Sequence, residues 1–445
     1  MMVKEVDSVL KVGKELAEYI VELSYDDLSS EVTHQTSRVI LDSLATMYLG
    51  TRKEDAEGII KFLEWNNASS DCTVIGTSLK TKVSWAAWAN AAYAQVHDCN
   101  DGHREAAALG GSPHPGRVAI PTALALGEKL HLSGKEIIAA IVVGYDVATK
   151  LRGMNTSPPT SAYCTASIAG KLIGLDADEM RFALGIAGFN SPRNFPRTMG
   201  LDTNFLSYGY QAKIGIEAAY LAKEGFNGPK LGDDSRLSTR FKSRGLGEKF
   251  EIMNVYIKPY PTCRMTHGAI DALLKMKQET EITPENVKEV KISQLTYGMY
   301  IADEKVGPDS YYKNCQFNLP YITACTIADG MVTEAQFTKE RIAYPLLHEL
   351  AEKVNVSPDE MLDAIYPEGH RPTVVEVTLS DESSHKMKID LPWGDPRNPL
   401  TDEQLLDKFL DWSTPSISDE QGRTIWKELQ RLDQIDDISE FMRLL

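Results

Sequence analysis

The 445-residue sequence lacks the features that mark membrane, secreted and disulfide-rich proteins. No stretch approaches the roughly 20 consecutive apolar residues that a membrane-spanning helix needs. The first 16 residues intersperse charged and apolar side chains without a run of signal-peptide length, so we predict a cytoplasmic protein with no membrane partner. The six cysteines include no Cys-x-x-Cys pair, which predicts reduced thiols rather than a disulfide framework.

Positive charge is also scarce. Asp and Glu outnumber Lys and Arg by 63 to 47, which gives a net charge of -16. A chain of this charge is repelled by phosphate backbones and by anionic lipid, so we predict no nucleic-acid partner. A small anionic substrate stays compatible with the composition, but it needs a locally basic pocket.

What the chain does contain is apolar material at regular spacing, with 42% hydrophobic residues over a length that favours two domains. Apolar residues recur at helical spacing through about the first 265 residues and predict about ten helices. Capping boxes mark helix starts at Ser133, Asp176 and Thr401. The helix that follows residue 30 is expected to stop at Gly50.

Beyond residue 280 the pattern changes to alternation of apolar and polar residues. The segment 285–295 predicts one strand, and 373–391 predicts two strands joined by the turn DESS. Helical segments are expected at 263–279, 316–330 and 355–365. The predicted fold is therefore mainly α, with a large all-α domain (1–266 and 397–445) and a smaller α+β lid domain (267–396) built on an antiparallel sheet. The final helices are expected to pack back onto the first domain.

The densest group of titratable side chains lies in residues 95–121, around a Gly-rich loop between two Ala-rich segments. Burying so many ionisable groups is costly unless they stay solvated or take part in chemistry, so this stretch is the predicted functional site. Its ionisable residues include three histidines, two aspartates and two arginines: His97, Asp98, Asp101, His103, Arg104, His114 and Arg117.

His114 stands between two prolines in the sequence GGSPHPGR. A loop of that composition exposes an imidazole whose ordinary pKa is about 6.5, which suits a general base that removes a proton from a carbon next to a carboxylate. Such a base typically contributes about 10²- to 10⁴-fold to the rate. The alternative is a surface histidine in a turn.

Asp98 and Asp101 are three residues apart and share a face if the segment is helical. Their mutual repulsion would raise the pKa of one carboxyl and let it donate a proton. Alternatively, Asp98 orients His114, or the segment is a solvated helix end. The stretch HDCNDGH also contains metal-ligand residue types, but its spacing fits no standard zinc signature, so we predict no metal.

Several stretches resemble the MmgE/PrpD family, which includes 2-methylcitrate dehydratase, cis-aconitate decarboxylase and iminodisuccinate epimerase. They occur in order over most of the first 275 residues. The matching pieces are YDDLSSEV (25–32), LDSLATMYLG (41–50), HDCNDGH (97–103), SPHPGRVAIPTALALGE (112–128), GYDVATKL (144–151), GIEAAYLAKEGFNGP (215–229) and KPYPTCRMTHGAIDAL (258–273).

The resemblance implies a helical domain with a smaller lid, a homodimer, no cofactor and a site between the domains. It further implies a small di- or tricarboxylic acid substrate and proton transfer next to a carboxylate. On the matching positions, Asp98 is the active-site acid and His114 the histidine of an HPS-like loop.

This chain departs from the family pattern at several positions. Gly102 stands where the family usually has threonine, and Asn155 or a neighbour replaces a loop histidine. Asn204 and Ser207 stand where many members have a lysine and a histidine, and Cys263 stands where decarboxylases have a histidine. These differences disfavour cis-aconitate decarboxylase.

A polycarboxylate in an acidic protein needs converging cations, and arginine grips carboxylates best. We expect Arg193 and Arg197, in NSPRNFPR, to substitute for the missing lysine, although both are alternatively surface residues. The full set of predicted substrate contacts is Arg193, Arg197, Lys258, Arg264, Asn204, Asp101, His103, Tyr163 and His267.

Cys263 is the third predicted catalytic residue, beside His114 and Asp98. Neighbouring Lys258 and Arg264 favour a thiolate there, which would act as an acid or base opposite His114. A buried, inert cysteine is the alternative. The predicted function is a cofactor-free lyase of the methylcitrate dehydratase type. An epimerase of the iminodisuccinate type and a non-catalytic carboxylate binder are the alternatives.

Overall fold

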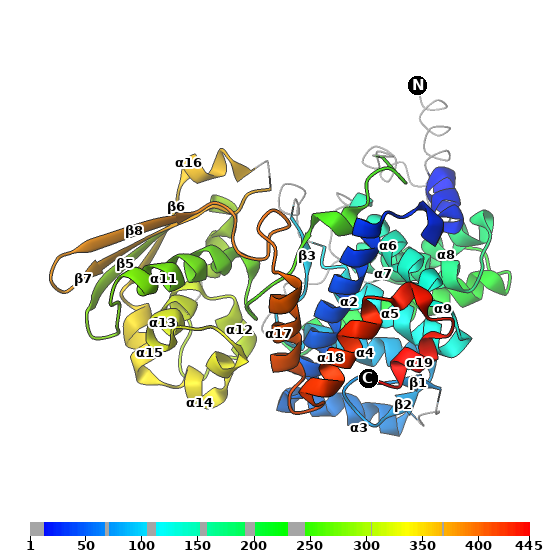
Figure 1. Ribbon diagram of the computed structural model, residues 1–445, viewed down its shortest axis with the longest axis horizontal. Helices are drawn as coiled ribbons and strands as arrows, with labels where there is room; N and C mark the ends of the chain where they lie inside the picture. The colour runs from blue at the N-terminus through cyan, green and yellow to red at the C-terminus, as the bar shows by residue number, and fades with distance from the viewer. Residues whose placement is uncertain are drawn as a thin grey trace.

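The computed structural model describes residues 13–66, 71–104, 113–151, 158–191, 201–229, 245–303, 305–366 and 369–445. Its elements form two lobes that lie side by side (Figure 1). The helical lobe comprises α2 to α9 and α17 to α19, and the mixed lobe comprises α11 to α16 and β5 to β8. This arrangement confirms a mainly helical fold, whereas the exact domain boundaries stay a prediction.

In the helical lobe, residues 13–22 are helical and precede the named elements. The helices are α2 (Ser30–Thr51), α3 (Glu57–Trp65), α4 (Val83–Val96), α5 (Gly116–Leu130), α6 (Gly134–Lys150), α7 (Pro158–Leu172), α8 (Ala177–Asn190), α9 (Thr203–Lys223), α17 (Asp402–Ser413), α18 (Asp419–Leu429) and α19 (Ile438–Met442). Short strands β1 (Cys72–Thr73), β2 (Lys80–Thr81), β3 (Gly102–His103) and β4 (Val255–Tyr256) pair as β1 with β2 and β3 with β4.

The Ala-rich helix α4 lies in the middle of this lobe and packs against α2, α5 and α9. Its small side chains let neighbouring backbones come close. A Cβ atom at Gly50 of α2 would lie 2.1 Å from the carbonyl oxygen of Tyr93 in α4. The predicted helix stop at Gly50 is therefore wrong, because α2 continues to Thr51 and the glycine serves close packing instead.

The mixed lobe places its helices against one small sheet (Figure 1). Its elements are α11 (His267–Glu279), α12 (Tyr312–Gln316), α13 (Leu319–Asp329), α14 (Lys339–Ile342), α15 (Pro345–Ala351), α16 (Glu360–Asp363), β5 (Val287–Gln294), β6 (Val354–Pro358), β7 (Thr373–Leu379) and β8 (Ser384–Ile389). Alternate residues of β7 are buried, and α11 packs against β7 and β8.

The sheet order is β6-β5-β7-β8. The pairs β5–β7 and β7–β8 are antiparallel as predicted, but β6 runs parallel to β5, so the sheet is mixed. The helix expected at 355–365 is wrong over its first part, because Val354–Pro358 forms this edge strand and only Glu360–Asp363 is helical. This segment forms a strand because it pairs with β5, which is far away in sequence, and that pairing outweighs the local helical pattern.

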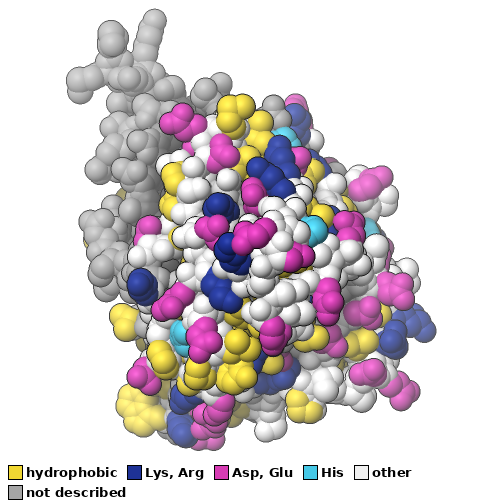
Figure 2. Space-filling model, turned by 90° about the vertical axis from the view of Figure 1, so that its left-hand side faces the viewer, with side chains coloured by type: hydrophobic (Ala, Val, Ile, Leu, Met, Phe, Trp, Pro, Cys, Tyr) yellow, Lys and Arg dark blue, Asp and Glu magenta, His cyan; other side chains and the backbone are white. Residues whose placement is uncertain are grey.

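The C-terminal helices return to the helical lobe as predicted, since α17 packs against α2. All six cysteines are free and buried. No described helix has the length and apolarity to cross a bilayer. On the face that the mixed lobe presents in Figure 2, Lys and Arg side chains are interspersed with Asp and Glu, so that face has no patch of a single sign.

Candidate active site

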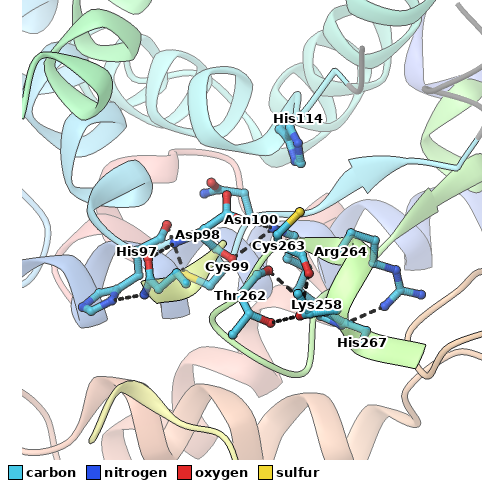
Figure 3. Close-up of polar contacts among 12 residues, drawn as sticks. His97, Asp98, Cys99, Asn100, His114, Lys258, Thr262, Cys263, Arg264 and His267 are labelled. Carbon is cyan, nitrogen blue, oxygen red and sulfur yellow. Dashed lines mark hydrogen bonds and ion pairs between the residues drawn. The ribbon is translucent and has the colours of Figure 1, made fainter. Parts of the chain in front are cut away.

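The candidate site lies where the segment after α4 meets the segment after β4 (Figure 3). Helix α4 ends at Val96, and His97 takes an extended conformation that turns the chain out of the helix. Strand β3 then pairs with β4, with Gly102 opposite Tyr256. This pairing brings residues 97–103 against residues 258–267, which are far apart in sequence.

His114 is half-buried, and its ring is fixed by the backbone. The Nδ1 atom lies 2.5 Å from the carbonyl oxygen of Asp101. Because a carbonyl oxygen can only accept, Nδ1 carries the proton and Nε2 carries the lone pair. Among the described residues, Nε2 has no hydrogen-bond partner.

Burial lowers the pKa of His114 well below its ordinary value, and the positive charges of Arg117, Lys258 and Arg371 lower it further. The imidazole is therefore neutral at pH 7, with a free acceptor nitrogen in a positive field. Figure 3 shows the ring pointing toward the place where Asn100 of the first segment and Cys263 of the second lie close together.

Asp101 holds three parts of the site together. Its backbone carbonyl receives His114, and its carboxyl accepts hydrogen bonds from the Tyr145 hydroxyl (2.6 Å) and the Gly116 amide (3.1 Å). Burial raises the pKa of this carboxyl to about 7, and the charge of Asp42 adds to the rise. A raised carboxyl pKa was expected here, but burial causes it rather than repulsion from Asp98.

Asp98 does not orient His114. Its carboxylate forms a buried ion pair with Lys258, with 2.7 Å between Oδ2 and Nζ. The same Nζ donates to the Asp98 carbonyl oxygen at 3.0 Å. Burial works to lower the pKa of Lys258, but the charge of Asp98, its hydrogen bond and the neighbouring groups together outweigh burial and raise the pKa. The predicted orienting role thus belongs to the Asp101 carbonyl, and Asp98 fixes Lys258.

Cys263 lies on the side of its segment that faces His114 (Figure 3). Its sulfur is 3.3 Å from the Tyr300 hydroxyl oxygen, and the side chain is buried. Burial raises the pKa of the thiol, and the lowering by Lys258 does not compensate. The predicted thiolate is therefore wrong, and the group is a protonated thiol.

Arg264 and His267 are occupied by neighbouring groups. Arg264 donates to the carbonyl oxygens of Trp393 (2.6 Å) and Pro392 (2.9 Å). It also donates to Nδ1 of His267 at 3.1 Å, so Nε2 of that ring carries the proton and donates to Thr262 at 3.3 Å. Both residues shape the segment around Cys263, and neither presents a free imidazole nitrogen or free Nη atom.

The side chains of two other predicted contacts, His103 and Tyr163, contact other groups. Nε2 of His103 is 2.9 Å from a carboxylate oxygen of Glu251. Tyr163 packs against α8, where a Cβ atom at Gly188 would lie 2.3 Å from the Tyr163 hydroxyl oxygen. Arg193, Arg197 and Asn155 lie outside the described residues.

Asn204 takes part in a polar cluster with a residue that sequence reasoning missed. Its Oδ1 accepts from Lys313 Nζ at 3.0 Å and from Gln95 Nε2 at 3.2 Å. Lys313 comes from α12 of the mixed lobe, 109 positions away, and also donates to the Gln95 carbonyl oxygen at 2.6 Å. Burial lowers the pKa of Lys313 to about 7. A lysine thus stands beside the position where the resemblance expects one, but no local pattern marks it.

Arg371, which precedes β7, is the second residue that sequence reasoning missed. Its positive charge lowers the pKa of His114. For metals, no group of three or more His, Cys, Asp or Glu side chains among the residues described here is arranged to hold an ion.

Comparison with known proteins covers nearly the whole chain. Residues 14–232 match the MmgE/PrpD N-terminal domain, and residues 260–434 match the MmgE/PrpD C-terminal domain. A cis-aconitate decarboxylase of Aspergillus terreus (strain NIH 2624 / FGSC A1156) is 24% identical over 493 residues, which cover 100% of this chain and 98% of that protein. The cis-aconitate decarboxylases of Mus musculus and Homo sapiens are 24% and 25% identical, over 98% and 95% of this chain and 93% and 92% of their own lengths.

Proposed function

The chain belongs to the MmgE/PrpD family, whose enzymes act on small carboxylic acids, and from this premise we propose that it is a cofactor-free lyase that removes a proton from a carbon next to a carboxylate. The observation that carries the proposal is the hydrogen bond from His114 Nδ1 to the Asp101 carbonyl, because it leaves Nε2 as a fixed base.

The surrounding cations serve the same step. Proton removal next to a carboxylate produces an enolate-like dianion, which positive charge stabilises. The positive charges of Arg117 and Lys258 act on His114. A bound carboxylate offsets this field, so the pKa of His114 rises when substrate binds and the imidazole becomes a stronger base.

Cys263 is the proposed proton donor. In a dehydration, His114 takes the proton from carbon, the carbon–oxygen bond breaks, and the hydroxide leaves as water with the thiol proton. A thiol whose pKa is raised by burial is protonated at pH 7 and suits this role. The imidazolium of His114 then gives a proton to solvent and the Cys263 thiolate takes one from solvent, which resets both groups.

Decarboxylation is the second candidate, because the cis-aconitate decarboxylases match this chain over almost its whole length. There the carbon–carbon bond breaks, carbon dioxide leaves, and the resulting carbanion takes a proton. Epimerisation uses the same two groups on opposite sides of one carbon. All three reactions share a carboxylate-stabilised carbanion.

The test is incubation in deuterated water with a panel of di- and tricarboxylic acids that includes citrate, 2-methylcitrate and cis-aconitate. We expect deuterium in the carbon skeleton of one acid, measured by NMR. New double-bond absorbance then indicates dehydration, released carbon dioxide indicates decarboxylation, and exchange with neither indicates epimerisation.

His114→Asn should slow the exchange by about 10²- to 10⁴-fold. The matched control is His131→Asn, since His131 is an exposed histidine in a left-handed conformation that asparagine tolerates. A His114→Asn protein as active as the control would refute the assignment of the base. Wild-type protein that exchanges no acid of the panel would favour a non-catalytic carboxylate binder.

We also propose a homodimer. Large apolar side chains are exposed in and next to α8 and α9, including Phe189 (71% exposed) and Phe226 (60% exposed). Such side chains often lie at subunit contacts. Light scattering should give twice the 49.4 kDa mass of the chain, and a monomer at micromolar concentration would contradict the proposal.

A further inference from the structure

Arg371 is a buried cation without a counter-ion. Its side chain is only 5% exposed, and Nη1 is enclosed without a hydrogen-bond partner. Within the described part of the chain, no carboxylate pairs with its guanidinium. A buried charge that lacks a partner is strongly unfavourable, so such a group is rare unless a ligand supplies the opposite charge.

A second arginine shares the same aromatic ring. The Cζ atom of Arg371 lies 5.0 Å from the ring centre of Tyr256, and that of Arg264 lies 4.8 Å from it. Burial lowers the pKa of Arg264 to about 10, and the charge of Arg371 contributes to the shift. Contact with a ring offsets only part of the cost of two neighbouring positive charges. Carbonyl oxygens occupy the Nη atoms of Arg264 and leave only its Nε without a partner, so Arg371 is the arginine of this pair that has a free Nη atom for an anion.

This arginine lies beside the proposed base. The ring of Tyr256 stands edge-on to the ring of His114, with 6.3 Å between their centres. The charge of Arg371 also acts on His114. Arg371 and His114 therefore both flank the ring of Tyr256.

Arg117 is a second buried cation that has an N–H donor without a partner, and it is far from Arg371 in the sequence. It is 7% exposed, its Nε is buried without a partner, and its Nη1 donates to Gln95 Oε1 at 2.7 Å. The residue begins α5 with its guanidinium stacked 3.4 Å from the ring centre of Tyr208. Arg117 and Arg371 thus come from different lobes, and the charges of both reach His114.

We infer that Arg371 binds one carboxylate of the substrate and Arg117 a second one, and that the two arginines hold the carbon between these carboxylates at Nε2 of His114. This inference rests on the proposed function and names the binding residues of the same site. It predicts that monocarboxylic acids bind poorly, because one of the two cations would stay unpaired.

The test is calorimetric titration of the full-length protein with tricarballylate, succinate and butyrate, which carry three, two and one carboxylates. Wild-type protein should bind the first two at least tenfold more tightly than butyrate. Arg371→Met should weaken tricarballylate binding by tenfold or more. Arg371→Lys keeps the positive charge but loses the planar, two-donor geometry of the guanidinium. Its affinity for tricarballylate should therefore lie between those of wild type and Arg371→Met.

Arg341 provides the matched control, because it also stacks on a tyrosine of the mixed lobe, with 4.8 Å to the ring centre of Tyr344, but has a carboxylate partner in Asp329. Arg341→Met should bind tricarballylate like wild type and melt at a lower temperature. Arg371→Met should melt at the same or a higher temperature without ligand, because it removes an unpaired buried charge.

Equal tricarballylate affinity in Arg371→Met and wild type would overturn the inference, as would wild-type protein that binds butyrate as well as succinate or binds none of the three. If Arg371→Met does not fold, Arg371→Lys decides, and unchanged affinity in that variant overturns the bidentate assignment. Deuterium exchange by wild-type protein in either case would leave the proposed function standing.

Discussion

Two groups of ionisable side chains in this protein behave in opposite ways. The paired group consists of Asp98 with Lys258 and Asp42 with Lys408, and every one of these side chains is at least nine-tenths buried. The unpaired group is represented by Arg371 and by the free nitrogen of His114. The difference separates groups that hold the molecule together from groups that are arranged for a ligand.

The paired group joins segments that are distant in sequence. Lys408 of α17 pairs with Asp42 of α2 and donates to the Lys258 carbonyl oxygen at 2.7 Å. Lys258 in turn pairs with Asp98 after α4. Each cation is matched by one anion, so these residues fix the C-terminal helices and the segment after β4 against the helical lobe. Removing one partner leaves the other as an uncompensated buried charge.

The largest expected effect follows from that argument. Lys258→Met should lower the free energy of unfolding by about 3–5 kcal/mol, because it strands the Asp98 carboxylate. The control is Lys288→Met, which breaks an exposed pair with Glu382 and should cost about 0.2–1 kcal/mol. Urea unfolding measures both. Similar small losses in the two variants would erase the distinction between the paired group and an ordinary surface pair.

The pH dependence of stability at Asp101 tests the comparison between the paired and unpaired groups. Its folded pKa of about 7 exceeds the ordinary value of 3.8, so the folded protein binds more protons than the unfolded chain between these values. Its contribution to stability therefore falls as pH rises from about 4 to about 7. Asp101→Asn removes this dependence, and its stability relative to wild type should increase by up to about 4 kcal/mol across that window.

Chemical denaturation at a series of pH values measures the effect of Asp101→Asn. The difference between variant and wild type should be flat below pH 4 and above pH 8. A difference that does not change with pH would show that Asp101 is ionised in the folded protein, and would place it among the paired charges.

Local sequence patterns predicted the parts of this fold that local interactions decide. The capping boxes at Ser133, Asp176 and Thr401 are present, because each forms within four residues. The strand pair β7 and β8 was also predicted, since its turn lies between adjacent segments. Strand β6 was missed because its partner β5 lies far away in sequence, and its five residues carry no signal of that pairing.

The same limit applies to the candidate site. The segment that contains Asp98, Asp101 and His114 was found because its titratable residues are close together in the sequence. Arg371 and Lys313 were missed because they come from the mixed lobe and meet the site only through the fold. Lys258 was predicted from the family resemblance. No local pattern could link it to Asp98, because 160 positions separate the two residues.

The smallest expected effect concerns Cys263, which belongs to neither group, because its sulfur contacts a hydroxyl rather than an opposite charge. Cys263→Ser should lower kcat by about tenfold and leave KM unchanged, because a hydroxyl donates its proton less readily than a thiol. Cys72→Ser is the matched control, since Cys72 is a buried thiol that lies near the Ala125 carbonyl in the helical lobe. Unchanged kcat in Cys263→Ser would transfer the donor role to Tyr300, whose hydroxyl oxygen lies 3.3 Å from the sulfur. Tyr300→Phe should then show the loss, and the thiol would be a packing group only.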